Sequence, residues 1–340
     1  MTGSAFAAGL PVSMRAVRYE RYGGPERLGL VQAAVPRPAA GEALVRVGAT
    51  SVNSWDWDLL RGHPWFVRLG APFRPAHPVL GADVAGEVVA VGSGVTGLRR
   101  GDPVWGDLSG AGWGGFAEFV TADASALRMR PAALGPVVAA AIPQAGGLAW
   151  QALVDVAALR AGERVLVIGA GGGAGTIAVA LAVHLGADVV AVDRAGKLDV
   201  VRALGATEVV DADAAVPGSA ADPFAEAAGF DVIVDLVATR PIDTYRRALR
   251  PGGRLVVVGG ALRTIAAVFA AGRRGDRDAD GKKMRVLAAK PNGGLGELGA
   301  LVASGAVTPV IDEVVPLERV PEALARIGAG TVRGKLVVVP

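Results

Sequence analysis

A run of glycines at 168–176, IGAGGGAGT, is the feature whose residue types and spacing point most directly to chemistry. Two registers of a dinucleotide-binding pattern fit it, Gly169, Gly171 and Ala174 in one and Ala170, Gly172 and Gly175 in the other. In either register the backbone can turn tightly and approach a pyrophosphate, whose charge is met by amide groups at the start of a helix. The candidate cofactor-binding residues are therefore Gly169, Gly171, Gly172, Gly173, Ala174, Gly175 and Thr176.

Three charged residues follow the next apolar run. Asp193 lies about 20 residues beyond the glycines, where a carboxylate accepts hydrogen bonds from the adenosine ribose and repels a 2′-phosphate. Arg194 and Lys197 come directly after it, and such cations suit a 2′-phosphate instead. The residues leave NAD(H) and NADP(H) both open, and a further interpretation makes all three surface charges at a strand end.

Aromatic and polar side chains are concentrated at 53–66, although the whole chain is only 5% aromatic. The segment holds Trp55, Trp57, Trp65 and Phe66 around Asp56 and His63. Flat rings suit a flat conjugated ligand, so one hypothesis is an aromatic substrate-binding mouth. The other is ordinary packing of a helix and loop on a β domain. For Asp56, a structural hydrogen-bonding role is favoured over that of a base.

The three histidines differ in what they suggest. His63 lies near the proposed mouth, where it could protonate an enolate, although solvent can deliver the same proton. No spacing pairs it with an orienting partner. His77 precedes a proline in a turn, and His184 lies on a predicted helix, so both are expected to be packing or surface residues.

Composition excludes several classes of site. The 340 residues include no cysteine, which excludes disulfides, a thiol nucleophile and every cysteine-containing zinc site. With 51% hydrophobic and 20% charged residues the chain is globular, and its net charge of +3 forms no basic stripe, so no nucleic-acid partner is expected. No run of about 18 apolar residues and no secretory signal occurs, so we expect a cytoplasmic protein without a membrane partner.

Two patterns of secondary structure divide the chain. Residues 14–122 show short alternating runs separated by Gly and Pro, which predict a mostly β domain, and residues 1–13 are predicted to be a frayed extension. From about Pro136, strands alternate with Ala-rich helices, as in βαβ units around a parallel sheet. The predicted strands are Arg164–Ile168, Asp188–Val192, Glu208–Val210, Val232–Leu236, Arg254–Val258 and Met284–Ala288. The mixed-charge stretch 273–283 is predicted to be a solvated loop.

The last part of the sequence predicts two helices and two strands. They are Leu295–Ser304, Val310–Val315, Val320–Ile327 and Lys335–Val339. These elements are too few to form their own domain, so we expect them to return to the β domain. The predicted α/β organisation is a substrate domain over 1–135, a cofactor domain over 136–297 and the return over 298–340, with a cleft between the domains.

Seven stretches together make the chain similar to the medium-chain dehydrogenase/reductase superfamily, specifically its zinc-independent quinone oxidoreductase branch. They are YGGPERL at Tyr22, SVNSWDWDLLRG at Ser51, HPVLGADVAGEVVAVGSGVTGLRRGDPVWG at His77, GGFAEFV at Gly114, IGAGGGAGTIAVALA at Ile168, ALRPGGRLVVVGG at Ala248 and RGKLVVV at Arg333. The resemblance covers nearly all of 14–340. It implies a GroES-like substrate domain, a Rossmann-type doubly wound cofactor domain and, less directly, a homodimer formed through a late strand.

The resemblance also implies an activity, which is hydride transfer from NAD(P)H, with NADP(H) slightly favoured, to a quinone or to the β-carbon of an enone. Asn53 matches the family's V-N-P-x-D motif, with Ser54 in place of the proline, and would donate a hydrogen bond to the developing oxyanion. Gly259 and Gly260 are expected beside the cofactor, with their amides as alternative donors. Gln144 would face the cleft and bind substrate or nicotinamide, or would instead cap a helix or serve as an interdomain contact.

Zinc is not expected. In zinc-dependent relatives the catalytic ligands would fall near Asn53, Ala82 and Gln144, which cannot form a normal zinc site, and the four-cysteine lobe is missing. Two alternative functions stay open. One is a specialised tailoring reductase for a single elaborate metabolite, suggested by the tryptophan-rich segment, and the other is a cofactor-binding protein with little turnover.

Overall fold

The computed structural model describes residues 9–214, 229–274 and 280–340. The chain divides into two compact units, which we call unit 1 (Met1–Gln144 with Ile311–Pro340) and unit 2 (Ala145–Val310). Both boundaries lie later in the sequence than 135/136 and 297/298. The first differs because α2 (Pro136–Ala140) packs against strands of unit 1. Among the described residues, no helix is both long enough and apolar enough to cross a bilayer.

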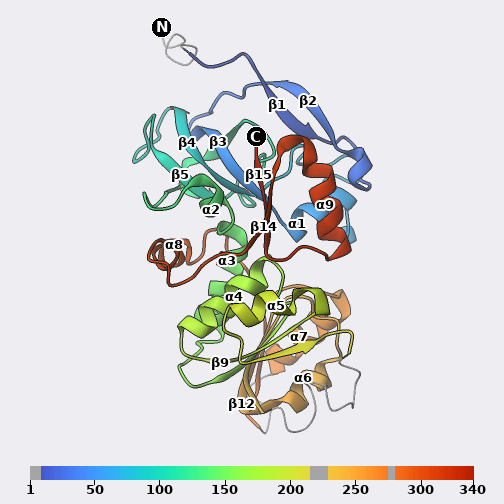
Figure 1. Cartoon of the computed structure of the whole chain (residues 1–340). Coiled ribbons are helices and arrows are strands. Elements are labelled where there is room, and N and C mark those ends of the chain that lie inside the picture. Colours follow the sequence, from blue (N-terminus) through green and yellow to red (C-terminus); the bar gives the residue numbers. More distant parts are fainter. Residues whose placement is uncertain (1–8, 215–228, 275–279) are drawn as a thin grey trace. The chain divides into compact units, whose positions relative to one another are not determined.

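Unit 1 is built on a seven-stranded sheet in the order β14-β15-β3-β4-β5-β7, with β6 pairing β3 (Figure 1). Its strands are β3 (Glu42–Val52), β4 (Asp83–Val91), β5 (Pro103–Asp107), β6 (Phe119–Asp123), β7 (Arg128–Met129), β14 (Ile311–Pro316) and β15 (Lys335–Val339). A separate antiparallel pair is formed by β1 (Ser13–Arg18) and β2 (Gly29–Ala34). Because β15 pairs with β3, strands from 311–339 complete the sheet that 42–129 begins.

The helices of unit 1 are short. They are η1 (Pro25–Arg27), α1 (Ser54–Arg61), η2 (Trp65–Arg68), η3 (Ala124–Ala126), α2, η7 (Leu317–Arg319) and α9 (Val320–Ala329). Helix α1 packs against α9, and a core of buried aliphatic and aromatic side chains lies between these helices and β15. This packing fixes the start of α1, where the candidate catalytic residue lies.

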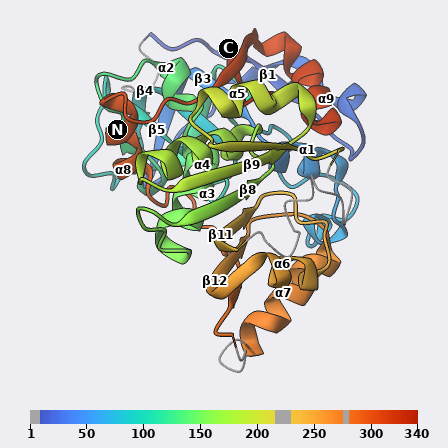
Figure 2. The ribbon, with the colours of Figure 1, turned by 60° about the horizontal axis from the view of Figure 1, so that its bottom comes forward.

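Unit 2 is a six-stranded parallel sheet in the order β10-β9-β8-β11-β12-β13, and Figure 2 shows β9, β8, β11 and β12 following one another across it. The strands are β8 (Arg164–Ile168), β9 (Asp188–Asp193), β10 (Glu208–Asp211), β11 (Phe230–Asp235), β12 (Leu249–Val257) and β13 (Lys283–Val286). The strand order reverses between β8 and β11, and in such sheets ligands bind outside the carboxyl ends of the strands at this point. The predicted doubly wound α/β fold is confirmed.

The helices of unit 2 cover the sheet and explain its apolar strands. They are α3 (Pro143–Trp150), which begins at the end of unit 1, a π-helical turn (Gln151–Val156), α4 (Gly173–His184), η5 (Ala195–Lys197), α5 (Leu198–Ala203), α6 (Ile242–Ala248), α7 (Leu262–Arg274) and α8 (Leu295–Ala303). Helices α4 and α5 pack on β8, β9 and β10, whereas α6 and α7 pack on β12 and β13. Strands covered on both faces carry apolar side chains on both, as the sequence indicated.

Two sequence predictions fall partly outside the described residues. Of the predicted solvated loop at 273–283, positions 275–279 are outside, and Lys283 begins β13. Of the predicted frayed extension, positions 1–8 are outside. Leu10 instead packs against the core cluster that contains Met14 and Phe119, so this described part of the predicted extension is not frayed.

Candidate active site

The glycine loop of unit 2 connects β8 to α4. Gly169 has a φ of 80°, a left-handed conformation that glycine adopts without strain, and its N–H donates to the Val192 carbonyl at 2.9 Å. A Cβ at Gly175 would lie 2.1 Å from the Gly169 carbonyl oxygen, so the first turn of α4 lies directly on the loop. The positive φ therefore belongs to one predicted register and the close helix packing to the other.

The tip of this loop has room for a phosphate. A Cβ at Gly172 would meet nothing closer than the Gly169 carbonyl oxygen at 3.5 Å. Gly172 caps α4 without a side chain, so the first-turn amides, from Gly173 to Gly175, are left for an anion. Thr176 differs from the prediction, because it is 1% exposed and its hydroxyl donates to the Gly173 carbonyl. The loop fits a dinucleotide pyrophosphate through backbone amides.

Asp193 ends β9 beside the loop. Its Oδ2 accepts the Gly171 N–H and its Oδ1 accepts the Arg194 N–H, both at 2.8 Å. Lys197 Nζ lies 3.8 Å from the same Oδ1, and the two side chains are 10% and 11% exposed. The carboxylate therefore holds the glycine loop and has a cation beside it. Arg194 is exposed at the start of the following turn.

The carboxyl ends of β8, β11 and β12 meet at the same edge of unit 2. Gly260 has a φ of 132°, and a Cβ there would lie 2.6 Å from the Val237 carbonyl oxygen. Gly259 lies next to the Leu236 carbonyl, and Leu236 borders Gly169. Both predicted glycines thus lie at the edge that carries the glycine loop.

Asp235 stabilises the turn at this edge of the sheet through hydrogen bonds. It is buried, and its carboxylate accepts the N–H groups of Val237 and Ala238 and the Tyr245 hydroxyl. Burial raises the pKa of Asp235, while these hydrogen bonds oppose the shift. The 236–238 turn, against which Gly259 and Gly260 lie, is held in place by one side chain.

In unit 1, Asn53 immediately precedes α1. Asp56 is the third residue of the helix, and its carboxylate accepts the Asn53 N–H at 2.8 Å and the Gly81 N–H at 2.9 Å. Burial raises the pKa of Asp56 to about 7, against the effect of these two hydrogen bonds. Asp56 is 0% exposed, which agrees with the structural role favoured from the sequence and leaves no access for substrate.

The side chain of Asn53 lies in a buried charged network. Asp83 Oδ2 accepts from Ser51 Oγ at 2.6 Å, Asn53 Nδ2 at 2.9 Å and Lys335 Nζ at 3.3 Å. Lys335 Nζ also donates to Asn53 Oδ1 at 2.5 Å and to the Val52 carbonyl at 3.3 Å. Lys335 is 2% exposed and Asp83 is 0% exposed, so this is a buried ion pair with its hydrogen bonds satisfied.

This network fixes the orientation of the Asn53 amide. An ammonium can only donate and a carboxylate can only accept, so Oδ1 must face Lys335 and Nδ2 must face Asp83. One of the two Nδ2 hydrogens is used by Asp83, which leaves a single N–H for a ligand. Asn53 is 7% exposed, so what it offers to solvent is small and directional.

A second carboxylate lies beside Asp83. Asp107 is the register partner of Asp83 across β4 and β5, and it accepts the Ser109 N–H at 2.8 Å. Burial, and then the neighbouring Asp83, raise the pKa of Asp107 to about 6, with Lys335 opposing. Lys335 is therefore the positive charge that offsets two buried aspartates.

Gln144 joins this network through its backbone. It is the second residue of α3, and its N–H donates to Asp83 Oδ1 at 2.7 Å. Its side chain is half-buried. The expected contact at a helix start is present, because Asp83 caps α3 at Gln144. A contact of the Gln144 side chain with substrate or nicotinamide remains a prediction.

The tryptophans separate into packed and exposed ones. A Cβ at Gly328 would lie 2.4 Å from the Trp57 ring, so Trp57 packs closely on α9. Trp55 also packs against the core of unit 1. Trp65 is 67% exposed, in η2. Packing thus accounts for Trp55 and Trp57, whereas it does not account for Trp65.

His63 has a neighbour that the spacing did not indicate. The backbone N–H of His63 donates to the backbone carbonyl of Asp58 at 3.0 Å, and the imidazole lies near the Asp58 carboxylate. Burial raises the pKa of Asp58 to about 6, and His63 and Arg61 oppose the shift. His63 is exposed on unit 1.

The positions that correspond to zinc ligands carry Asn53, buried Ala82 and Gln144. In the described part of the chain, no three His, Asp or Glu side chains are grouped so that they could hold a metal ion. Asn53 is already bonded to Lys335 and Asp83. The donor set at these positions does not fit a tetrahedral zinc site.

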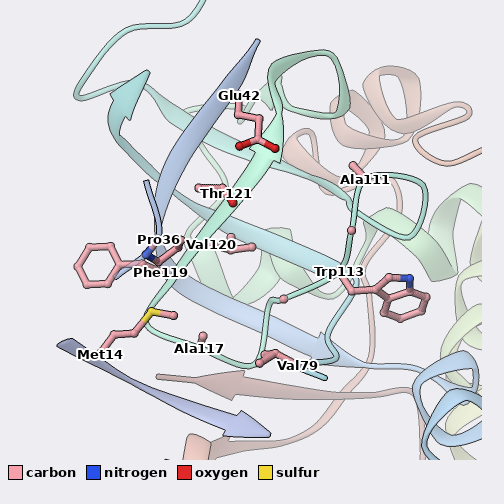
Figure 3. A pocket seen from close by; sticks show the side chains of 12 residues that line it. Met14, Pro36, Glu42, Val79, Ala111, Trp113, Ala117, Phe119, Val120 and Thr121 are labelled. Carbon is pink, nitrogen blue, oxygen red and sulfur yellow. The ribbon is translucent and has the colours of Figure 1, made fainter. Parts of the chain in front are cut away.

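Unit 1 also has a pocket of about 280 Å³ lined by none of the predicted site residues (Figure 3). Glu42 and Thr121 lie at one end of it and Met14, Ala117 and Val79 at the other. Glu42 Oε2 accepts the Ala39 N–H at 2.9 Å. Its polar side chains, Glu42 and Thr121, lie at one end and are not those that the sequence assigns to the reaction, so we do not place the reaction here.

Sequence reasoning missed Asp83 and Lys335 as parts of the site. Each stands at the start of an apolar strand, DVAGEVVAV and KLVVV, and a charge at such a position was an available signal. Their contact could not be predicted from the sequence, because 252 positions separate the two residues.

Comparisons with known proteins agree with this geometry. Residues 39–133 match the model of the alcohol dehydrogenase GroES-like domain, and residues 204–338 match the model described as zinc-binding dehydrogenase. The chloroplast envelope quinone oxidoreductase homolog of Arabidopsis thaliana is 35% identical over 96% of this chain and 98% of its own length. The NADPH-dependent alkenal/one oxidoreductase of the same plant is 29% identical over 98% of this chain and 81% of its own.

The solved quinone oxidoreductase from Coxiella burnetii superposes with a TM-score of 0.83 at 27% identity, over 96% of this chain and 99% of that one. The chain is an oxidoreductase and belongs to the medium-chain dehydrogenase/reductase superfamily, in its zinc-independent quinone oxidoreductase branch.

Proposed function

We propose that this protein reduces a quinone or an α,β-unsaturated carbonyl compound with NAD(P)H. The observation that carries the proposal is that one chain contains both an open glycine loop, in unit 2, and a buried amide of fixed orientation, in unit 1. The names of the quinone oxidoreductase homolog and the alkenal/one oxidoreductase support the substrate class. When bound, the dinucleotide supplies a hydride from the nicotinamide C4.

Asn53 supplies the electrostatic part of the reaction. As the hydride reaches the substrate, negative charge develops on the carbonyl oxygen, and the free Nδ2–H of Asn53 donates to it. Lys335 donates to Oδ1 of the same amide and so holds this N–H in one direction. Solvent delivers the proton that completes the reduction, and exposed His63 is the alternative donor.

We propose NADPH as the preferred cofactor. Asp193 would repel a 2′-phosphate, but its carboxylate already accepts the Gly171 and Arg194 amides and has Lys197 beside it. With that charge offset, Lys197 and exposed Arg194 suit a 2′-phosphate. We also propose a homodimer through β13, one of the two edge strands of the unit 2 sheet among the described residues.

The experiment that tests the activity is the loss of reduced-nicotinamide absorbance by chelator-treated protein. NADH and NADPH are offered separately with quinones, enones and simple ketones. Turnover of quinones or enones with undiminished rate after chelation is the expected result. Cofactor binding without turnover of any acceptor would instead support a specialised substrate or a non-catalytic role.

A further inference from the structure

An exposed surface on unit 1 lies outside the proposed reaction. It comprises apolar and basic side chains from one stretch, Arg61, Trp65, Arg68, Leu69, Phe73 and Arg74, and we call it the aromatic-basic surface. Trp65, Leu69 and Phe73 are 67%, 70% and 87% exposed. Three large apolar side chains this exposed within nine residues form a patch that calls for a partner.

The backbone beneath this surface is held in place. The Tyr22 hydroxyl donates to the Ala71 carbonyl at 2.8 Å, and Arg68 Nε donates to the Gly62 carbonyl at 2.8 Å. The Arg68 guanidinium also lies over the Tyr22 ring, 4.7 Å from its centroid. The Leu69 N–H donates to the Phe66 carbonyl at 3.0 Å. Leu69 and Phe73 are therefore exposed on a segment whose backbone is held by hydrogen bonds.

The charge of the surface has one sign. No Asp or Glu occurs between Leu59 and Ala82. Of the flanking acids, Asp58 is half-buried, and Asp83 is 0% exposed and paired with Lys335. Among the described residues Arg61, Arg68 and Arg74 form no ion pair, so their charges are available to an external anion.

The nearest stretch of unit 1 does not reverse this sign. Tyr22 belongs to it, and its exposed acids, Glu20 and Glu26, are accompanied by Arg21 and Arg27. Glu26 lies 3.8 Å from the Arg27 guanidinium. The positive field of the aromatic-basic surface is therefore not cancelled by its immediate surroundings.

We propose that the aromatic-basic surface binds the anionic phospholipid surface of a membrane. Exposed Trp, Phe and Leu enter the headgroup region, and arginines beside them meet lipid phosphates. A lipid interface is favoured over a protein partner because the apolar side chains are exposed and line neither the pocket at Glu42 nor the one at Arg46. A fluid interface accepts such projections without a complementary shape. The expectation of no membrane partner came from the lack of a spanning segment and of a secretory signal, neither of which is needed for binding at a lipid surface.

The test is co-sedimentation of the full chain with vesicles of phosphatidylcholine alone or mixed with phosphatidylglycerol. We expect binding only to the anionic vesicles, weakened by salt. Leu69→Ser/Phe73→Ser should lower the partition coefficient at least about tenfold. Arg61→Gln and Arg74→Gln should each lower it about fivefold. The matched controls, Met129→Ser and Arg99→Gln, change an exposed apolar and an exposed basic side chain elsewhere on unit 1 and should leave binding unchanged.

Several results would overturn the proposal. They are no binding to anionic vesicles, an equal loss in the control variants, or a loss with the arginine variants alone, which would indicate bare charge attraction without insertion. Binding of soluble poly-glutamate without vesicle binding would assign the surface to an acidic protein. Turnover of a water-soluble quinone by Leu69→Ser/Phe73→Ser verifies its fold. Because vesicle binding is measured without substrate, this inference and the proposed function succeed or fail separately.

Discussion

At the scale of single residues, the side chain of Asn53 lies between a donor and an acceptor of opposite charge. Lys335 donates a hydrogen bond to the amide oxygen of Asn53, and Asp83 accepts a hydrogen bond from its Nδ2. One N–H of fixed direction is left, and in the proposed reaction it is the group that meets the substrate. Preorganised donors of this kind need no rearrangement during the reaction, which is why they stabilise a developing oxyanion more than water does.

Asn53→Ala is expected to lower kcat by about 10²- to 10³-fold with cofactor affinity unchanged, because one oxyanion donor is lost. Stopped-flow or steady-state rates and a separate NADPH titration measure the two quantities. Equal losses in kcat and in cofactor affinity would show that the substitution disturbs the protein generally and would remove the assigned role.

The role of Lys335 is expected to depend on Asn53. Lys335→Met alone leaves Asp83 buried without its cation, a change of several kcal/mol, so the neutral pair Lys335→Met/Asp83→Asn is the useful variant. It should lower kcat about tenfold when Asn53 is present and have no further effect in the Asn53→Ala background. A loss of the same size in both backgrounds would make the ion pair purely structural.

Asp193→Ser should shift the ratio of kcat/KM for NADPH over NADH upward by about tenfold, because a charge that repels the 2′-phosphate is removed. Lys197→Met should shift it the other way. Asp193→Asn is the matched control, since its amide oxygen can still accept the Gly171 N–H. If the ratio stays constant in all three variants, Asp193 does not contact the cofactor.

At the scale of elements, α4 packs closely on the glycine loop. A Cβ at Gly175 would press on backbone atoms, which cannot move aside as a side chain can. Gly175→Ala is expected to weaken NADPH binding at least about tenfold and to lower the melting temperature. Gly296→Ala, also at a helical glycine of unit 2 but with nothing within 4 Å, should do neither. Unchanged binding in Gly175→Ala would mean that this helix start does not position the phosphates.

The elements of unit 2 were predictable because a strand buried on both faces has a continuous apolar run whose ends are marked by glycine or charge. β8 and β9 begin where the sequence placed them. β12 begins at Leu249, ahead of the predicted Arg254, because its early residues pair across a bulge with Phe230, which no local pattern reveals. The glycine loop was found for the same reason as the strands, since all of its determinants are local.

The site in unit 1 was predictable only in part. Asn53 and Asp56 are three residues apart in a motif and were identified together. Lys335 and Asp58 were missed as partners of Asn53 and His63, because one depends on strand pairing across the whole sequence and the other on the fold of a helix end. Spacing reports contacts within an element and says little about contacts between elements.

At the scale of the whole molecule, buried aspartates should make stability depend on pH. Asp56, Asp58 and Asp107 have pKa values raised by burial to about 7, 6 and 6, above the value of 3.8 in the unfolded chain. The stabilisation from their protonation is complete below the unfolded pKa and is lost as pH rises through 6 to 7. The melting temperature should therefore decrease as the pH is raised from about 5 to about 8.

A series of thermal melts across this range checks the expectation. Glu118, Glu163 and Glu313 have lowered pKa values, so their contributions change at more acidic pH and do not oppose the trend. Asp58→Asn, at the most accessible of the three aspartates, should flatten the slope. A melting temperature that rises with pH in this window would show that ionisation of the buried aspartates does not destabilise the folded protein.

The division of the chain also has a consequence for its synthesis. Residues 145–310 form unit 2 without interruption, whereas unit 1 needs β14 and β15 from the far end of the sequence. On the ribosome, the cofactor unit can therefore fold before the sheet of unit 1 can close. Until Lys335 has been translated, Asp83 lacks its cation and the Asn53 amide has no fixed direction. In the proposed reaction, the strand that orients the Asn53 amide is thus translated long after the unit that would hold the dinucleotide.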